Sequence, residues 1–147
     1  MKASELRLGN YVISKSHNGM LTTVRGIFIS EIRLDANPLA TYKPTDLEPV
    51  PLTKEILSKA WFEYEDGDFI NGLWKLKPDY QKGEIIGYGL FVKLLDWTRT
   101  NQNSIKYLHQ LQNLFFAING EELIIDSYAP VERKQMQDKL DKALNEL

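Results

Sequence analysis

The clearest pattern of hydrophobic and polar positions lies in residues 104–120. Apolar side chains recur there at spacings of three or four, which places them on one face of an α-helix. They are Ile105, Leu108, Leu111, Phe115 and Ile118, and Tyr107, Leu114 and Phe116 widen the face. Ser104 suits the N-cap, and Gly120 suits the left-handed residue that ends a helix. The broad stripe predicts a helix over 104–119 that packs on a sheet or between two elements.

Residues 1–52 show a different pattern, in which short runs of β-branched and aromatic residues alternate with turn signals. The runs lie at 11–13, 20–30 and 31–35, and Asn18-Gly19 suits a tight hairpin turn. Pro49 and Pro51 argue against a central strand at the end of this region, because proline cannot donate to a ladder. Four or five short strands in about fifty residues predict a small SH3-like β-barrel or a strongly bent meander.

Residues 53–128 are expected to form an α+β module in the order helix, strand, strand, helix, strand. Thr53 caps a short helix that ends near Phe62, and the two strands follow at 69–76 and 84–95. The helix over 104–119 comes next, and the apolar run at 123–125 predicts the last strand. The chain is therefore predicted to be an α+β protein.

Residues 129–147 are predicted to form a C-terminal helical tail, which Pro130 begins. Met136, Leu140, Ala143 and Leu147 follow the 4-3-4 spacing of a coiled-coil seam. The pattern covers about two heptads, whereas a convincing seam needs three or four. We expect either an amphipathic helix that docks on the body or frays at its end, or weak self-association as a homo-oligomer.

Five polar residues on or just after the central helix form the candidate contact patch: His109, Gln112, Asn113, Glu121 and Glu122. Helical spacing makes the first three neighbours along one edge. Either this edge is a polar pocket, or Gln112 hydrogen-bonds backbone groups of the packing partner while His109 lies at the core boundary. Glu121 and Glu122 stand at the unfavourable end of the helix dipole. They mark a bound cation or partner, a general acid and base, or two solvated carboxylates.

Composition and charge narrow the function classes. The 147 residues are 43% hydrophobic and 26% charged, as in an ordinary soluble globular protein. Eighteen basic against 20 acidic residues give a net charge of −2, which does not support a nucleic-acid partner except through a local basic patch. The lack of cysteine excludes disulfides, thiolate metal sites and cysteine nucleophiles. Without a signal-peptide core or a long apolar run, we expect a cytoplasmic protein with no membrane partner.

Catalytic and cofactor motifs are missing from the sequence. His17 and His109 have no second ligand at metal-binding spacing, and the acidic stretch 63–68 does not match an EF-hand loop. The glycines at 83, 87 and 89 fit neither a P-loop nor a dinucleotide-binding turn, and no nucleophile-elbow serine occurs. The sequence therefore predicts no catalytic residue, no metal and no cofactor, and it favours a protein that is not an enzyme.

Aromatic and basic residues leave two nucleic-acid alternatives open. The three tryptophans, Trp61, Trp74 and Trp97, either fill the core or combine with lysines into a stacking surface for single strands. The lysines in question are Lys75, Lys77 and Lys93. A second alternative uses the N-terminal barrel and requires its basic residues to converge on one face: Lys15, Arg25, Arg33 and Lys43.

Several segments of the chain have a familiar sequence. Residues 5–12 read ELRLGNYV, residues 47–53 read LEPVPLT, and residues 107–117 read YLHQLQNLFFA ahead of GEEL at 120–123. Over residues 5–123 the chain resembles a family of small uncharacterised proteins from Bacteroidetes and from their phages and mobile elements. The family commonly has glycine in place of Trp61 and threonine in place of Asn119. The resemblance implies a bacterial or phage cytoplasmic setting and carries no function.

These observations favour a non-enzymatic protein-interaction or accessory module of a phage or mobile element, with a protein as partner. Nucleic-acid binding through the N-terminal barrel is the first alternative. A carboxylate-based hydrolase is the second, and it requires a cleft holding two acids with raised pKa values.

Overall fold

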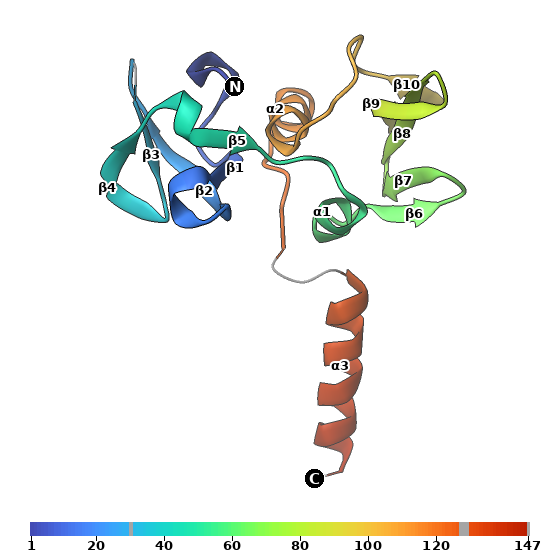
Figure 1. Cartoon of the computed structure of the whole chain (residues 1–147). Coiled ribbons are helices and arrows are strands. Elements are labelled where there is room, and N and C mark those ends of the chain that lie inside the picture. The colour runs from blue at the N-terminus through green and yellow to red at the C-terminus, as the bar shows by residue number, and fades with distance from the viewer. Residues whose placement is uncertain (30, 127–129, 147) are drawn as a thin grey trace. The chain divides into compact units, whose positions relative to one another are not determined.

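The computed structural model describes residues 1–29, 31–126 and 130–146, with the backbone alone for 130–134 and 136 (Figure 1). Within these residues the chain is an α+β protein, as the sequence predicted, and it has two five-stranded antiparallel sheets and three α-helices. The chain divides into two compact units. Unit 1 comprises Met1–Leu52 and Ile105–Leu123, and unit 2 comprises Thr53–Ser104 and Ile124–Leu147.

The sheet of unit 1 has the strand order β4-β3-β2-β1-β5. Its strands are β1 (Tyr11–Ser14), β2 (Met20–Ile27), β3 (Ile32–Leu34), β4 (Asn37–Tyr42) and β5 (Leu47–Pro49), and short 3₁₀ turns occupy Ala3–Glu5, Lys15–His17 and Pro44–Asp46. Asn18 and Gly19 both have positive φ, 54° and 72°, but they end a five-residue loop, residues 15–19, instead of forming the predicted tight hairpin turn by themselves. Pairing ends at β4 and β5 without closing the sheet, so the meander is confirmed and the closed barrel is not.

One face of this sheet builds the core of unit 1. Alternation along β2 and β3 points apolar side chains inward, so they are almost completely removed from solvent. The core consists of Leu6, Val12, Val24, Ile32, Leu34, Tyr42 and Leu47. Burying a side chain of this size stabilises the fold by roughly 1.5–3 kcal/mol before entropy is counted.

Helix α2 (Leu108–Asn119) ends as predicted, because Gly120 has φ 75° and its N–H donates to the carbonyl of Phe116. Its predicted start at Ser104 is wrong. Residues 105–107 are extended because they pair with residues 50–52: Leu108 N–H donates to Val50 O at 2.8 Å, and Leu52 N–H donates to Lys106 O. Helix α2 also packs on β1. These contacts group α2 with residues 1–52, whereas the sequence had assigned it to the module 53–128.

Unit 2 begins with helix α1 (Lys54–Lys59), and the hydroxyl of Thr53 accepts a hydrogen bond from Ile56 N–H, as a capping threonine should. The helix stops at Ala60. Trp61 then has φ 65°, a left-handed conformation that glycine adopts without strain. Its indole N–H donates to the Asp126 carboxylate at 3.0 Å.

The sheet of unit 2 is a consecutive meander with the order β10-β9-β8-β7-β6. Its strands are β6 (Glu63–Glu65), β7 (Asp68–Asn71), β8 (Trp74–Gln81), β9 (Glu84–Lys93) and β10 (Trp97–Arg99). The edge strands β6 and β10 lie outside the two strands predicted at 69–76 and 84–95. The predicted turn over 77–83 shrinks to Lys82-Gly83, because both residues take positive φ, 51° and 81°, and close a two-residue hairpin.

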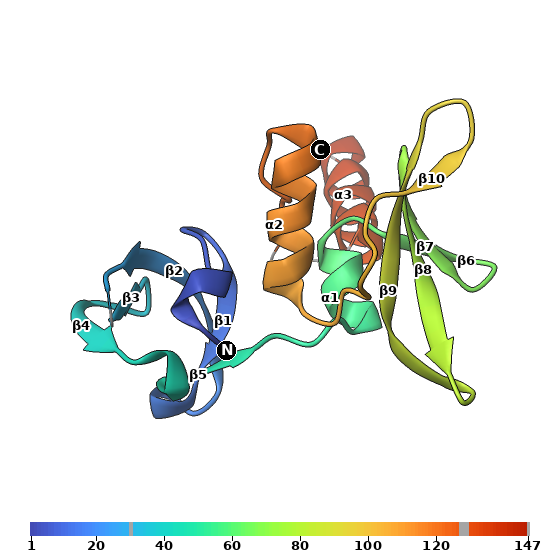
Figure 2. The same cartoon turned by 90° about the horizontal axis from the view of Figure 1, so that it is seen from above.

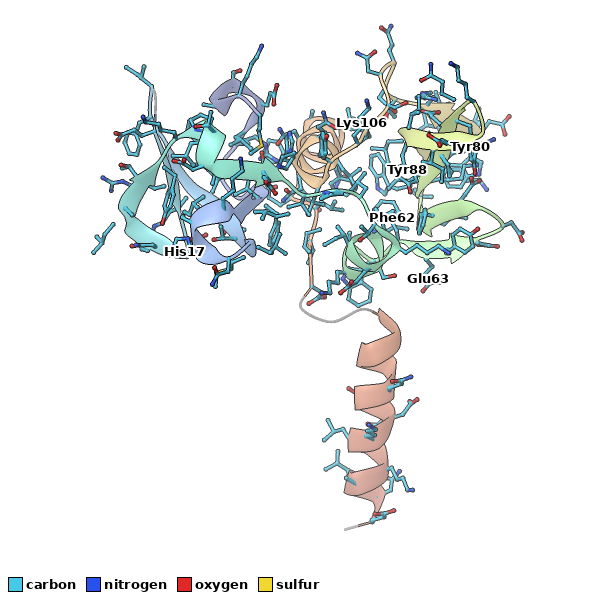
Figure 3. The ribbon with its side chains drawn as sticks, in the orientation of Figure 1. His17, Phe62, Glu63, Tyr80, Tyr88 and Lys106 are labelled. Carbon is cyan, nitrogen blue, oxygen red and sulfur yellow. The ribbon has the colours of Figure 1, made fainter. Side chains whose placement is uncertain are left out.

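The two faces of this sheet differ in character. One face carries buried residues, among them Phe69, Leu76 and Leu90, and α1 lies beside the sheet (Figure 2). Phe62, just after α1, and Tyr88, on β9, are also buried (Figure 3), and the Tyr88 ring meets Phe69 edge-on with 6.0 Å between centroids. Alternation along β8 and β9 sends Lys75, Lys77 and Phe91 to the opposite face.

The end of the chain differs in part from the prediction. Residues 123–125 form no strand; Leu123 is buried, and Asp126 N–H donates to Lys59 O. Helix α3 (Pro130–Asn145) is the predicted C-terminal helix, and Leu140 and Leu144 are exposed on it. The side chains of Met136 and Leu147, two of the four seam residues, lie outside the described part of the chain.

Among the described residues, no helix has both the length and the apolar character needed to cross a bilayer.

Candidate functional site

The predicted contact patch divides into residues that fasten the start of the chain and residues that do not. Gln112 is 2% exposed, and its side chain serves two backbone groups of the segment entering β1. Its Oε1 accepts from Tyr11 N–H at 3.0 Å, and its Nε2 donates to Gly9 O at 3.2 Å. This confirms the alternative in which Gln112 satisfies the backbone of its packing partner. The amide is therefore committed to the fold.

Asn113 completes the same attachment from the next position on α2. Its Oδ1 accepts from Arg7 Nε at 3.1 Å and from Asn10 Nδ2 at 2.9 Å, and its Nδ2 donates to Glu5 O at 2.9 Å. Asn10 is itself fully buried, and its Oδ1 accepts from Arg7 N–H. The three hydrogen bonds of Asn113 leave little capacity for an external ligand.

Glu122 forms an ion pair instead of an acid pair with its neighbour. Arg7 donates to both Glu122 oxygens, at 2.5 and 3.1 Å, and its guanidinium lies 4.1 Å from the centroid of the Phe116 ring. Glu121 is exposed. The arrangement places a cation between Glu122 and the helix end, so the unfavourable dipole contact is relieved by Arg7. We call Arg7, Asn10, Gln112, Asn113 and Glu122 the α2 network.

His109 is a core residue, which corrects its expected position at the core boundary. It is 2% exposed and stacks on Tyr107 with 6.0 Å between centroids and 8° between ring planes. Its Nδ1 is buried without a hydrogen-bond partner among the described residues. Burial lowers the pKa of His109 below its ordinary value of 6.5, against a smaller opposing effect of Glu5. A buried neutral imidazole of this kind is a packing element.

A serine–histidine contact that the sequence did not reveal occurs in the turn after β1. Ser14 Oγ lies 2.9 Å from His17 Nδ1, and the His17 ring packs on Tyr42 at 5.8 Å (His17 is labelled in Figure 3). Ser14 is completely buried, so its hydroxyl is closed to a substrate. The contact closes the turn and does not form a nucleophilic site.

The basic residues of unit 1 have separate contacts. Arg25 lies near the Asp35 carboxylate at 3.8 Å, and Arg33 stacks over Phe28 at 5.2 Å. Lys15, in contrast, donates to Thr45 O beside β5, at the other end of the strand order. Convergence of Lys15, Arg25, Arg33 and Lys43 on one face therefore stays a prediction.

The exposed face of the second sheet does gather basic and aromatic residues. Lys93 and Trp97 face each other across β9 and β10, and Lys75 and Phe91 face each other across β8 and β9. Lys75 Nζ lies 4.5 Å from the Trp97 ring centroid and Lys93 Nζ lies 5.5 Å from it. We call this surface the basic face: Lys75, Lys77, Phe91, Lys93, Trp97 and Arg99. Of the three tryptophans only Trp97 belongs to it, because Trp74 shares the face of buried Leu76 and Trp61 contacts Asp126.

An ion pair anchors the far end of the basic face. Arg99 donates to both Asp79 oxygens, at 2.8 and 2.7 Å, and Ser104 Oγ donates to the same carboxylate at 2.5 Å. The hydrogen bond from Arg99 lowers the pKa of Asp79 below its ordinary value of 3.8. A lowered pKa is the opposite of what a general acid requires. Gly89 makes room for this pair, because a Cβ there would lie 2.9 Å from the Arg99 guanidinium.

A shallow hollow of about 620 Å³ adjoins this ion pair and is lined by Arg99, Thr100, Asn101 and Gln102. Its polar groups already serve the protein. The Asn101 side chain accepts from Leu90 N–H at 2.7 Å and donates to Tyr88 O at 3.2 Å, which extends the pairing of β9 beyond β10. The hollow therefore offers few free polar groups to a ligand.

Three leucines form an apolar end of the second sheet. Leu73, in the turn before β8, is 62% exposed, and Leu94 and Leu95, in the turn before β10, are 75% and 100% exposed. Lys93 N–H donates to Leu73 O at 2.8 Å, so the two turns lie side by side. No local sequence pattern indicates this cluster, because the leucines are contributed by separate turns.

No group of histidine, cysteine, aspartate and glutamate side chains suited to a metal ion occurs in the described parts of the chain. No protein-family model, no curated protein and no solved structure matches this chain. The case for a function therefore rests on the surfaces described above.

Proposed function

We propose that the chain is a non-enzymatic protein-interaction module, an accessory protein of a phage or mobile element of the kind its sequence segments resemble. The apolar end of the second sheet carries the proposal. Leu94 and Leu95 are 75% and 100% exposed, and Leu73 is adjacent to them. Isolated exposed leucines are ordinary, but three on neighbouring turns form a contiguous apolar surface that is best explained by a partner.

The energetics favour a protein partner for this end. Full burial of one leucine side chain is worth roughly 1.5–3 kcal/mol, so three leucines supply a substantial apolar anchor. Hairpin turns also project side chains far enough to enter a pocket on another protein.

We further infer that unit 1 is an SH3-like barrel left open between β4 and β5. Two features support this: β1 pairs with both β2 and β5, and the 3₁₀ turn Pro44–Asp46 leads directly into β5. Exposed apolar residues on this unit, Phe28, Ile29 and Leu39, would give it a second contact surface.

Site-specific photo-crosslinking in host cells tests the proposal. A photoreactive amino acid replaces Leu95, and the matched control places the same group at Lys82, in the exposed turn at the other end of β8 and β9. We expect one discrete product from position 95 that is absent from position 82 and is lost when Leu73 and Leu94 are changed to serine. Equal products at both positions, or a product insensitive to the serine changes, would contradict the assignment.

A further inference from the structure

The second sheet carries a charge distribution that the net charge of the chain conceals. Strand alternation places four cations on one face of β8–β10, namely Lys75, Lys77, Lys93 and Arg99. Asp79 is the carboxylate that shares this face on β8, and it is bound by Arg99. Lys75, Lys77 and Lys93 thus concentrate three positive charges on the β8–β9 part of the face, whereas the same alternation places Glu63, Glu65 and Asp68 on its β6–β7 part. Such a concentration attracts an anionic ligand along the face.

Aromatic rings lie between these cations. The Trp97 ring has Lys75 Nζ at 4.5 Å and Lys93 Nζ at 5.5 Å from its centroid. The Phe91 ring has Lys75 Nζ at 5.6 Å and the Arg99 guanidinium carbon at 6.0 Å. Both rings are partly exposed, and they stand on neighbouring strands. Each ring is therefore accompanied by an ammonium group within reach of a phosphate.

We infer that the basic face binds single-stranded nucleic acid, with Trp97 and Phe91 as stacking platforms and the three lysines as phosphate contacts. Single strands present the two chemistries that match this surface, a flat base and a negative charge, at every nucleotide. In a duplex the base faces are stacked on one another, so a duplex could contact only the lysines of the basic face and not its aromatic rings. This inference is independent of the protein-interaction proposal, because it uses the face of the sheet and not its apolar end.

Arg99 has a different role from the lysines. Both ends of its guanidinium fork donate to Asp79, so its charge is already neutralised and it supports the Phe91 side of the face. Three free lysines predict a slope of about −2 in a plot of log affinity against log salt for a single strand. Each lysine that is removed should reduce the slope by about 0.7.

Fluorescence anisotropy with labelled twelve-residue oligo-dT and oligo-U, at about 50 mM salt, tests the inference on the full chain. We expect saturable binding to either oligonucleotide and weaker binding to a duplex of equal length. Lys75→Ala with Lys93→Ala should weaken binding about tenfold or more. The matched control, Lys139→Ala with Lys142→Ala on α3, removes the same charge from exposed sites and should stay within about twofold.

Three further variants separate the contribution of stacking from that of charge and from that of the apolar end. Trp97→Leu should weaken binding about tenfold, because one stacked base is lost. Lys77→Glu leaves both rings in place and should also weaken binding. Leu95→Ser, which targets the protein-interaction proposal, should leave oligonucleotide affinity unchanged.

The inference is overturned by any of three results. These are no saturable binding to either oligonucleotide, equal losses in the α3 control, or binding of poly-glutamate or duplex as strong as that of the single strands. The last result would assign the face to acidic partners in general.

Discussion

The α2 network and the basic face are both built from polar and aromatic residues, but the polar groups of their side chains make different contacts. In the α2 network, Gln112 and Asn113 terminate on groups of the same unit, and Gln112 is 2% exposed. On the basic face, the ammonium groups of Lys75 and Lys93 lie over the partly exposed ring of Trp97. Satisfied, buried polar groups hold a fold together, whereas exposed cations over rings are available to a ligand. The comparison assigns the first region to stability and the second to binding.

Gln112→Ala should produce the largest effect on stability. It removes the two part-buried hydrogen bonds to Tyr11 N–H and Gly9 C=O and empties the buried site of the Gln112 amide. At about 1–3 kcal/mol for each unsatisfied group, we expect the free energy of unfolding to fall by about 3 kcal/mol. Urea denaturation measures this change.

Gln137→Ala, at an exposed position of α3, is the control and should change the free energy of unfolding by less than about 0.5 kcal/mol. A loss below about 1 kcal/mol for Gln112→Ala would contradict the assignment of the α2 network to stability.

Lowering the pH should reduce the stability of unit 1 through His109, and this effect should be smaller than that of Gln112→Ala. Burial lowers the pKa of His109 in the folded state, so the unfolded state binds a proton more readily. Stability is therefore unaffected well above the ordinary pKa of 6.5 and falls as the pH drops through the lowered value. One proton contributes at most about 1.4 kcal/mol per pH unit. The measurement is urea denaturation between pH 7 and about pH 4.5, above the range in which Asp79 titrates.

His109→Phe is the matched variant for that series. It keeps an aromatic ring against Tyr107 and removes the titrating group. Its stability should change less with pH than that of the original chain over the same interval. Identical pH profiles for the two proteins would show that His109 is not the titrating group responsible.

Lys75→Ala should produce the smallest effect on stability and thereby sharpen the contrast. The ammonium contacts two partly exposed rings, and an exposed cation–π pair is worth about 0.5–1 kcal/mol. We expect the free energy of unfolding to fall by no more than that amount in urea denaturation. A loss as large as that of Gln112→Ala would make the basic face a structural element as well.

Segments that lie far apart in the sequence meet in the α2 network. Arg7 and Asn10 come from the stretch ELRLGNYV, Gln112 and Asn113 from YLHQLQNLFFA, and Glu122 from GEEL. The sequence singled out the right residues on the helix edge, but it could not name their partners. Arg7 and Glu122 are separated by 115 positions, and no local pattern encodes a contact over that distance.

The sequence by itself determined the features that local chemistry controls. Thr53 caps α1, Asn18 and Gly19 take positive φ at the end of the loop 15–19, and Gly120 ends α2, because each depends on dihedral preferences or hydrogen bonds within a few residues. Tertiary structure alone decided the start of α2, which pairing with residues 50–52 delays to Leu108. It also decided that no strand forms at 123–125 and that Trp97 meets Lys75 across β9. These outcomes depend on which distant strand supplies a partner, and hydrophobic periodicity contains no information about that choice.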